Sequence, residues 1–216
     1  MRSGLRTVHC ALMEGRRSLP RLQAADRRRQ LLDVAADLFA RRGFGGTTTA
    51  ELAKGAGVTE PILYRHFTNK LDLFITLIDQ VGAHVIHQWE EALEGVVDPK
   101  DRLKILVAAK PTTLQLGAAP YRIIVQAITE SGRDPAIVSA VRRHVSNLHG
   151  FLMAELQNLQ KHNVVRNDEP ATALAWLLIE VAIGRGMLET SRIAAPTETG
   201  LTKDRHRLLE YLLRSH

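Results

Sequence analysis

Residues 59–66 (TEPILYRH) carry side chains that could recognise the edges of DNA bases. Arg65 could donate two hydrogen bonds to guanine, Glu60 could accept one from a cytosine amino group, and Ile62 could contact a thymine methyl group. A helix presenting these side chains would fit the major groove, where each base pair exposes a distinct pattern of donors and acceptors. The residue types therefore indicate readout of a DNA sequence.

A second set of side chains suits phosphate groups, which fix the position of a protein on DNA without reporting its sequence. Its members are Thr48, Thr49, Tyr64, His66 and Lys70. Glu60 lies beside them, and phosphates would repel its carboxylate unless it accepts a hydrogen bond from a base. Its alternative role is at the N-terminus of its own helix, where a negative charge is favourable.

Other chemistry is weakly indicated. His84, His87 and Glu90 recur at spacings of three residues, which could place them on one helix face as metal ligands. No cysteine pair accompanies them, so we interpret them as partly exposed helix residues and predict no metal site. The sequence has neither a glycine-rich phosphate loop nor a serine in a nucleophile elbow. An acid–base pair would need Glu130 or Glu180 beside a histidine, which no spacing indicates, so we expect neither enzyme activity nor a cofactor.

Two short helices are predicted to hold the DNA-reading side chains, with a four-residue break between them. Thr48 or Thr49 can cap the first helix, because a hydroxyl accepts hydrogen bonds from free N–H groups of the opening turn. Gly57 can end that helix in the left-handed conformation. Thr59 can cap the second, with Pro61 in its first turn. Their apolar positions are Leu52, Ala53, Ala56, Leu63 and Phe67, and the pair forms a helix-turn-helix.

The spacing of these residues resembles the DNA-binding domain of the TetR family of bacterial transcriptional regulators, over about residues 26 to 75. The matching positions are Thr48, Leu52, Ala53, Ala56, Gly57, Val58, Thr59, Leu63, Tyr64, His66, Phe67, Lys70 and Leu73. The resemblance implies that residues 59–62, including Thr59 and Pro61, and residues 64–66 touch DNA, while Lys70 touches its backbone. It also implies that the fourth helix links ligand and DNA modules, and that the last two helices form a four-helix dimer interface.

The remaining periodicity is helical throughout, so we predict an all-α chain. A helix capped by Asp26 and ending near Arg42 completes a three-helix domain, which needs a fourth helix for stability because three short helices bury little area. The further helices are predicted at about residues 70–95, 103–116, 121–131, 135–161, 170–191 and 203–213. The domains expected are a flexible basic arm (1–24), the helix-turn-helix domain (25–70), and a ligand-binding and dimerisation domain (71–216).

The charge is unevenly distributed along the 216 residues. Residues 1–70 contain 13 Lys or Arg and 6 Asp or Glu, whereas the rest contains 16 basic and 17 acidic residues. A basic first third beside a near-neutral remainder is typical of a nucleic-acid module joined to a regulatory module. The single cysteine, Cys10, excludes an internal disulfide. We recognise neither a secretion signal nor a membrane span and expect a cytoplasmic protein.

The second half offers candidates for an effector site and a dimer face. Polar or amphipathic side chains interrupt apolar stripes at Gln115, Tyr121, Gln126, Trp176 and Glu180, as expected of an apolar pocket with a few orienting groups. Each could instead be a satisfied core or interface residue. The last two helices carry surplus apolar side chains at Ala175, Leu178, Ile179, Ala182, Ile183, Leu208, Leu209, Tyr211 and Leu212.

Together these features predict a homodimeric repressor that binds a palindromic double-stranded DNA operator and responds to an unidentified small molecule. An activator on the same fold is the first alternative. A helical ligand carrier or enzyme without a DNA role is the second.

Overall fold

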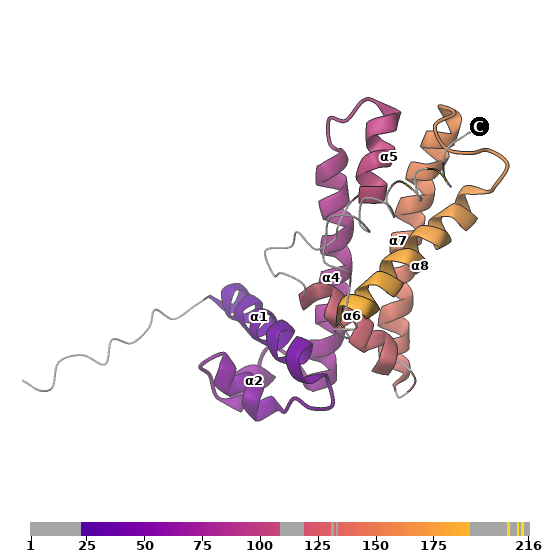
Figure 1. Ribbon diagram of the computed structural model, residues 1–216. Helices are drawn as coiled ribbons and strands as arrows, with labels where there is room; N and C mark the ends of the chain where they lie inside the picture. Colours follow the sequence, from indigo (N-terminus) through magenta and orange to yellow (C-terminus); the bar gives the residue numbers. More distant parts are fainter. Residues whose placement is uncertain are drawn as a thin grey trace, which may run out of the picture.

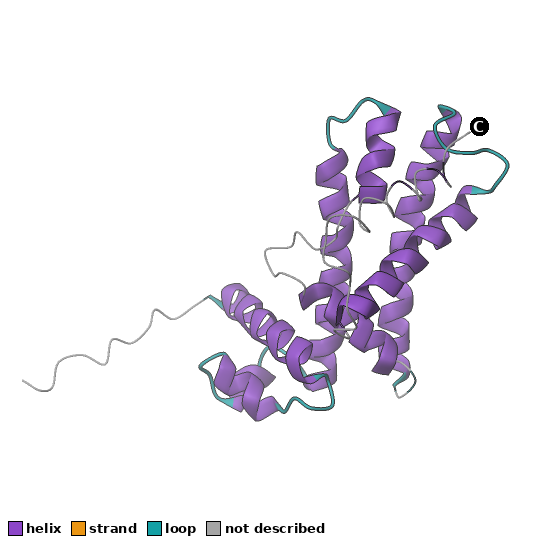
Figure 2. Cartoon of the chain, viewed as in Figure 1, coloured by secondary structure: helices purple, strands orange, loops and turns teal. Residues whose placement is uncertain are grey.

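The computed structural model describes residues 23–108, 119–130, 132 and 134–190, together with positions 207, 211 and 213. Every regular element within these residues is a helix (Figure 1 and Figure 2). The helices are α1 (Ala24–Arg42), α2 (Thr49–Gly55), α3 (Glu60–Tyr64), α4 (Lys70–Leu93), α5 (Pro99–Ala108), α6 (Ala119–Glu130), α7 (Pro135–Lys161) and α8 (Ala171–Thr190). The predicted all-α fold class is confirmed.

The starts of the long helices follow their capping residues. The Asn69 side chain accepts from the Asp72 backbone N–H at 2.8 Å and opens α4, and Asp134 accepts from Ala136 at 2.8 Å to open α7. The predicted cap at Asp26 is wrong, because α1 begins two residues earlier, at Ala24, after Gln23. Asp26 lies instead in the first turn, where its negative charge favours the helix N-terminus.

One hydrophobic cluster joins α1, α2 and α3 to the first half of α4. Phe74 of α4 lies 5.1 Å from Phe39 and 4.8 Å from Phe44, measured between ring centroids, and Phe39 and Phe74 are fully buried. Helix α4 supplies much of the core of the three-helix domain, and the dependence of that domain on α4 for stability stays a prediction. Leu52 of α2 and Leu63 of α3 are buried in the same cluster.

A second hydrophobic cluster fills the other half of the molecule, between α4, α5, α7 and α8. Trp89 of α4 stacks on Phe151 of α7 with ring centroids 5.7 Å apart. Ala175, Leu178 and Ile179 of α8 belong to this cluster and are 0%, 8% and 1% exposed. Their predicted place in a dimer face is therefore wrong, since the monomer already buries them.

Helix α6 lies at the centre of the arrangement and packs against α1, α4, α7 and α8 (Figure 1). Its side chains Ile123, Ile124 and Ala127 belong to the first cluster, so α6 joins the larger helices to the DNA-binding helices. Close by in the bundle, Gly82 of α4 lies against the buried ring of His144 on α7. A Cβ at position 82 would lie 2.5 Å from His144 Nδ1, so only glycine allows this approach.

Several predictions fall on residues that the structure does not describe. They are the basic arm over residues 1–22, the segment 109–118, and nearly all of the last helix, of which only positions 207, 211 and 213 are described and are helical. None of the described helices combines the length and apolar character needed to cross a membrane.

Candidate nucleic-acid interface

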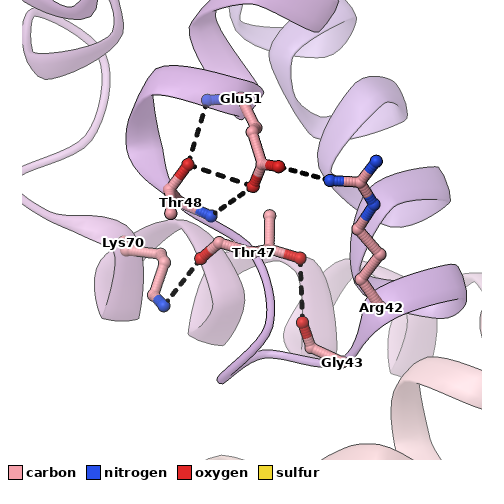
Figure 3. Close-up of polar contacts among 6 residues, drawn as sticks. All are labelled: Arg42, Gly43, Thr47, Thr48, Glu51 and Lys70. Atoms are coloured by element: carbon pink, nitrogen blue, oxygen red, sulfur yellow. Dashed lines mark hydrogen bonds and ion pairs between the residues drawn. The ribbon is translucent and has the colours of Figure 1, made fainter.

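A capping box opens α2, the first helix of the helix-turn-helix (Figure 3). Thr48 Oγ1 accepts from the Glu51 backbone N–H at 3.2 Å, and Glu51 Oε2 accepts from the Thr48 backbone N–H at 2.9 Å. The Glu51 carboxylate also accepts from the Thr48 hydroxyl at 3.0 Å, and the bonds that it accepts from the Thr48 backbone N–H and hydroxyl, assisted by Arg42, lower the pKa of Glu51. The predicted cap at Thr48 is confirmed, and its hydroxyl is engaged within the protein.

The loop from α1 to α2 is held from both sides. Arg42, the last residue of α1, pairs with Glu51 of α2 (Figure 3). Thr47, which is buried, donates its hydroxyl to the Gly43 carbonyl at 2.8 Å. A Cβ at Gly46 would lie 2.4 Å from the Arg42 carbonyl oxygen, so the chain turns there only with glycine. The loop is therefore fixed by side-chain bonds and one obligatory glycine.

Lys70 fastens the same loop to the start of α4. Its Nζ donates to the carbonyls of Phe44 and Thr47 at 2.9 and 2.8 Å, and it lies 4.4 Å from the centroid of the Phe44 ring. Sequence reasoning assigned Lys70 to a phosphate and did not foresee these partners. Lys70 thus positions the loop, and its predicted contact with DNA stays a prediction.

The turn between α2 and α3 follows the predicted chemistry. Gly57 has φ +65°, the left-handed conformation that glycine adopts without steric cost. Pro61 lies in the first turn of α3, and Leu63 and Phe67 are 1% and 2% exposed. Thr59 occupies the cap position, but its side chain makes no capping bond to α3. The hydroxyl of Thr59 is thus not needed to cap the helix.

Glu60 is tied to α2. Its Oε2 accepts from Thr49 Oγ1 at 2.7 Å, which joins the first turn of α3 to the first turn of α2. Both residues were predicted to contact DNA, Glu60 through a base and Thr49 through phosphate. The bond gives each of them a role in holding the two helices at a fixed angle.

Arg28 of α1 supports α3 and was missed by sequence reasoning. Its guanidinium lies 4.3 Å from the centroid of the Phe67 ring and donates to the His66 carbonyl at 3.2 Å. The contact spans 38 positions of sequence, so no local pattern could have revealed it. It holds the backbone just after the reading helix.

The outward surface of α3 is formed by the remaining predicted residues. Thr59, Pro61, Tyr64 and Arg65 are exposed, and Ile62 and His66 are half-buried. Within the described part of the chain, the guanidinium of Arg65 has neither a hydrogen bond nor an ion pair. A fork of donors that is held on a fixed helix and free of internal partners can bind a base edge or a phosphate.

The predicted effector residues are not all together. Trp176 is 44% exposed and Glu180 is exposed, so both lie on the outer face of α8, and their contact with an effector stays a prediction. The Trp176 ring packs on His149 with centroids 5.0 Å apart. Gln126 is half-buried on α6. Gln115 lies outside the described residues, and Tyr121 is described only through the backbone of α6.

In the described ranges, no group of three or more His, Cys, Asp or Glu side chains is placed to hold a metal ion. His87 lies 3.8 Å from Glu90 and 3.4 Å from Glu91 across an exposed helix surface.

Comparisons with known proteins agree with this geometry. Residues 31–77, which include α2 and α3, match the sequence model of the bacterial regulatory proteins of the tetR family. The HTH-type transcriptional activator FasR of Mycolicibacterium smegmatis is 32% identical over 128 residues, which are 59% of this chain and 58% of FasR. The matched stretch thus spans less than two thirds of that relative.

Two solved structures share the fold. A putative transcriptional regulator from Saccharomonospora viridis, in complex with choline, has a TM-score of 0.73 at 21% identity and covers 87% of this chain and 95% of its own. FadR from Bacillus subtilis, in complex with stearoyl-CoA, has a TM-score of 0.68 at 18% identity and covers 86% of this chain and 97% of its own. At sequence identities of 21% and 18%, these two structures show a shared fold and nothing more.

Proposed function

We propose that the chain is a member of the TetR family of bacterial regulatory proteins and that it regulates transcription by binding a DNA operator through α3. The observation that carries the proposal is Arg65, exposed and without an internal partner in the described structure, on a helix that Glu60 and Arg28 hold in place. Because these contacts hold α3 within the protein, DNA binding does not have to order the helix. The entropy cost of binding is therefore lower, which favours affinity.

Operator binding would use two copies of the chain. One helix of this kind reads only a short half-site, and a two-fold dimer places its two reading helices about 34–36 Å apart in successive major grooves. Large apolar side chains remain exposed on α8 and near the C-terminus: Trp176 at 44%, Met187 at 43% and Tyr211 at 66%. Burying them between two copies would remove apolar surface from water, so we propose this side of the molecule as the dimer face.

A small-molecule effector would act through the domain formed by α4 to α8. Both structural neighbours described above were solved with a small molecule, stearoyl-CoA in one and choline in the other. One conformation of the protein fits the operator and another does not. For release from DNA, the effector must have a higher affinity for the second conformation, because equal affinities leave their populations unchanged.

Repression in the effector-free state is the form of regulation that we propose. A further relative, KstR2 of Mycobacterium tuberculosis, is 32% identical over 87 residues and is named a repressor. Activation is the second candidate, because FasR, the relative that is 32% identical, is named an activator. A promoter–reporter assay with and without the protein separates them by the sign of the change in transcript.

The test is a footprint on the DNA flanking the protein's own gene and, if that fails, selection from fragmented genomic DNA. We expect protection of a palindromic site, and sedimentation should give a dimer with and without DNA. The variant Arg65→Ala should lose the footprint, whereas Arg142→Ala, which removes an exposed arginine from α7, should retain it. No specific fragment at low or moderate salt would refute the DNA role and favour a ligand carrier or enzyme.

A further inference from the structure

Five buried side-chain atoms in the described structure lack a hydrogen-bond partner, and all belong to α4, α6 or α7. They are Gln88 Oε1, Trp89 Nε1, Arg122 Nε, Gln126 Oε1 and His144 Nδ1. Buried polar atoms are bonded in the great majority of cases. Two of the five lie one turn apart on α6, the helix that packs against α1, α4, α7 and α8.

Arg122 is the unusual member of this set, because a guanidinium stays charged at any physiological pH. Its Nε is shielded from solvent, and no hydrogen bond or ion pair of Arg122 occurs among the described residues. The neighbouring side chains Ile123 and Ile124 are 0% and 4% exposed. Arg122 as a whole is half-buried, and only its Nε is shielded from solvent, so this N–H lacks both water and a protein acceptor. An anion bound beside the guanidinium would supply the missing acceptor.

The other half-buried arginines in the described ranges all have partners. Arg102 donates to both oxygens of Glu155, at 2.9 and 2.8 Å from Nη2, and to the carbonyls of Leu93 and Val96. Arg27, Arg28 and Arg166 bond to Gln30, to the His66 carbonyl and to Asp168. Arg122 is therefore the half-buried arginine in the described ranges that has no hydrogen-bond or ion-pair partner.

We propose that Arg122 and Gln126 bind the anionic group of an amphipathic effector, such as a carboxylate or a phosphate on an apolar chain. The proposal rests on the function proposed above, whose effector it assigns to a chemical class. The fork of N–H donors on a guanidinium matches a carboxylate or phosphate. The Gln126 amide, one turn away, would bind the anion through its N–H₂ donors, because its Oε1 only accepts. A quaternary ammonium would be repelled by the same guanidinium.

This position would connect an effector to the DNA-binding helices. Ile123 and Ala127, on the adjoining face of α6, pack in the same cluster as Phe39 of α1. An anion bound by Arg122 would therefore act on a helix whose next face already contacts the DNA-binding domain.

The experiment measures binding of matched probes to the full-length protein by isothermal titration calorimetry and thermal melting. The probes are dodecanoate, dodecyl phosphate and dodecyltrimethylammonium, each below its micelle concentration. We expect one or both anions to bind and raise the melting temperature. The relative affinity of dodecanoate and dodecyl phosphate then identifies the anionic group, and the ammonium should bind at least about tenfold more weakly.

The variant Arg122→Gln should weaken anion binding by about tenfold or more, because it removes a charged hydrogen bond. Arg142→Gln, on the surface of α7, should leave binding unchanged. Without ligand, Arg122→Gln should melt no lower than the wild type, since the lost charge has no internal partner in the described structure. A drop in its melting temperature would show a structural role and overturn the proposal.

Two further outcomes would overturn the inference: an ammonium that binds the wild type as tightly as the anions, or anion binding that survives Arg122→Gln. The footprint separates this failure from failure of the proposed function. A protein that protects its operator but binds no anion refutes only the effector class. A protein that binds the anions through Arg122 but protects no DNA refutes the regulator.

Discussion

Replacing Lys70 by methionine tests whether this residue organises the DNA-binding domain. The substitution keeps most of the aliphatic stem but removes an ammonium that bonds the carbonyls of Phe44 and Thr47 and lies over the Phe44 ring. Hydrogen bonds to charged groups contribute about 1.5–3 kcal/mol each, and a cation–π contact adds about 0.5–1 kcal/mol at an exposed site. Because the terms are not additive and the site is only half-buried, we expect a loss of about 2–4 kcal/mol.

Urea denaturation followed by far-UV circular dichroism measures this loss. The control is Lys54→Met, which removes an exposed lysine in the last turn of α2 and should change stability by less than about 0.5 kcal/mol. A loss below about 1 kcal/mol for Lys70→Met, no larger than that of an ordinary surface change, would refute the positioning role.

The salt dependence of operator binding then tests the predicted phosphate contact of Lys70. If its ammonium also binds a phosphate, the slope of log affinity against log salt should fall by about one ion in Lys70→Met. An unchanged slope with lowered stability would leave Lys70 as a positioning residue alone.

Three further predictions concern single residues. Arg65→Ala should weaken specific operator binding by about 1–3 kcal/mol if it makes a bidentate base contact, as measured by titration against the operator and a scrambled duplex; an equal loss on both would make it a phosphate ligand. Burial lowers the pKa of His144 despite the opposing effect of Asp79, so the unfolded chain takes up a proton at higher pH than the folded one. Stability should therefore fall as pH drops below the ordinary histidine value of 6.5, and His144→Gln should flatten this dependence in chemical denaturation at several pH values; a steeper loss would contradict the assignment. Gly82→Ala should destabilise by about 1–3 kcal/mol because its Cβ would overlap the His144 ring; His144→Ala in the same chain should recover most of the loss, and no recovery would locate the strain elsewhere.

The local features of the fold could be predicted from sequence because they depend on short spacings. The Thr48 cap, the left-handed Gly57 and Pro61 in the first turn of α3 each follow from one or two neighbouring residues. The long helices follow from apolar periodicity over several turns, and their capping residues Asn69 and Asp134 mark their starts.

The tertiary partners of polar residues could not be predicted in this way. Glu60 and Lys70 looked like DNA ligands because their types and positions allow it, but the fold brings them to Thr49 and to two loop carbonyls. Trp176 interrupts an apolar stripe whether it faces a pocket or solvent, since periodicity gives the face of a helix but not its neighbour. At Arg122 no sequence pattern indicates an unusual environment, and only the packing of α6 reveals that its Nε is shielded without a partner.

The contact of Gly82 with His144 has a geometric consequence for α4. Position 82 is twelve residues from Lys70, which corresponds to about 18 Å along the helix axis. Interface shifts in protein switches are commonly about 1–2 Å, and a rod of this length produces such a shift at its end when it tilts by only about 3–6°. If α4 pivots where the Gly82 backbone meets the His144 ring, a small change of packing in the bundle would move α3, and in the proposed dimer it would change the spacing of the two reading helices.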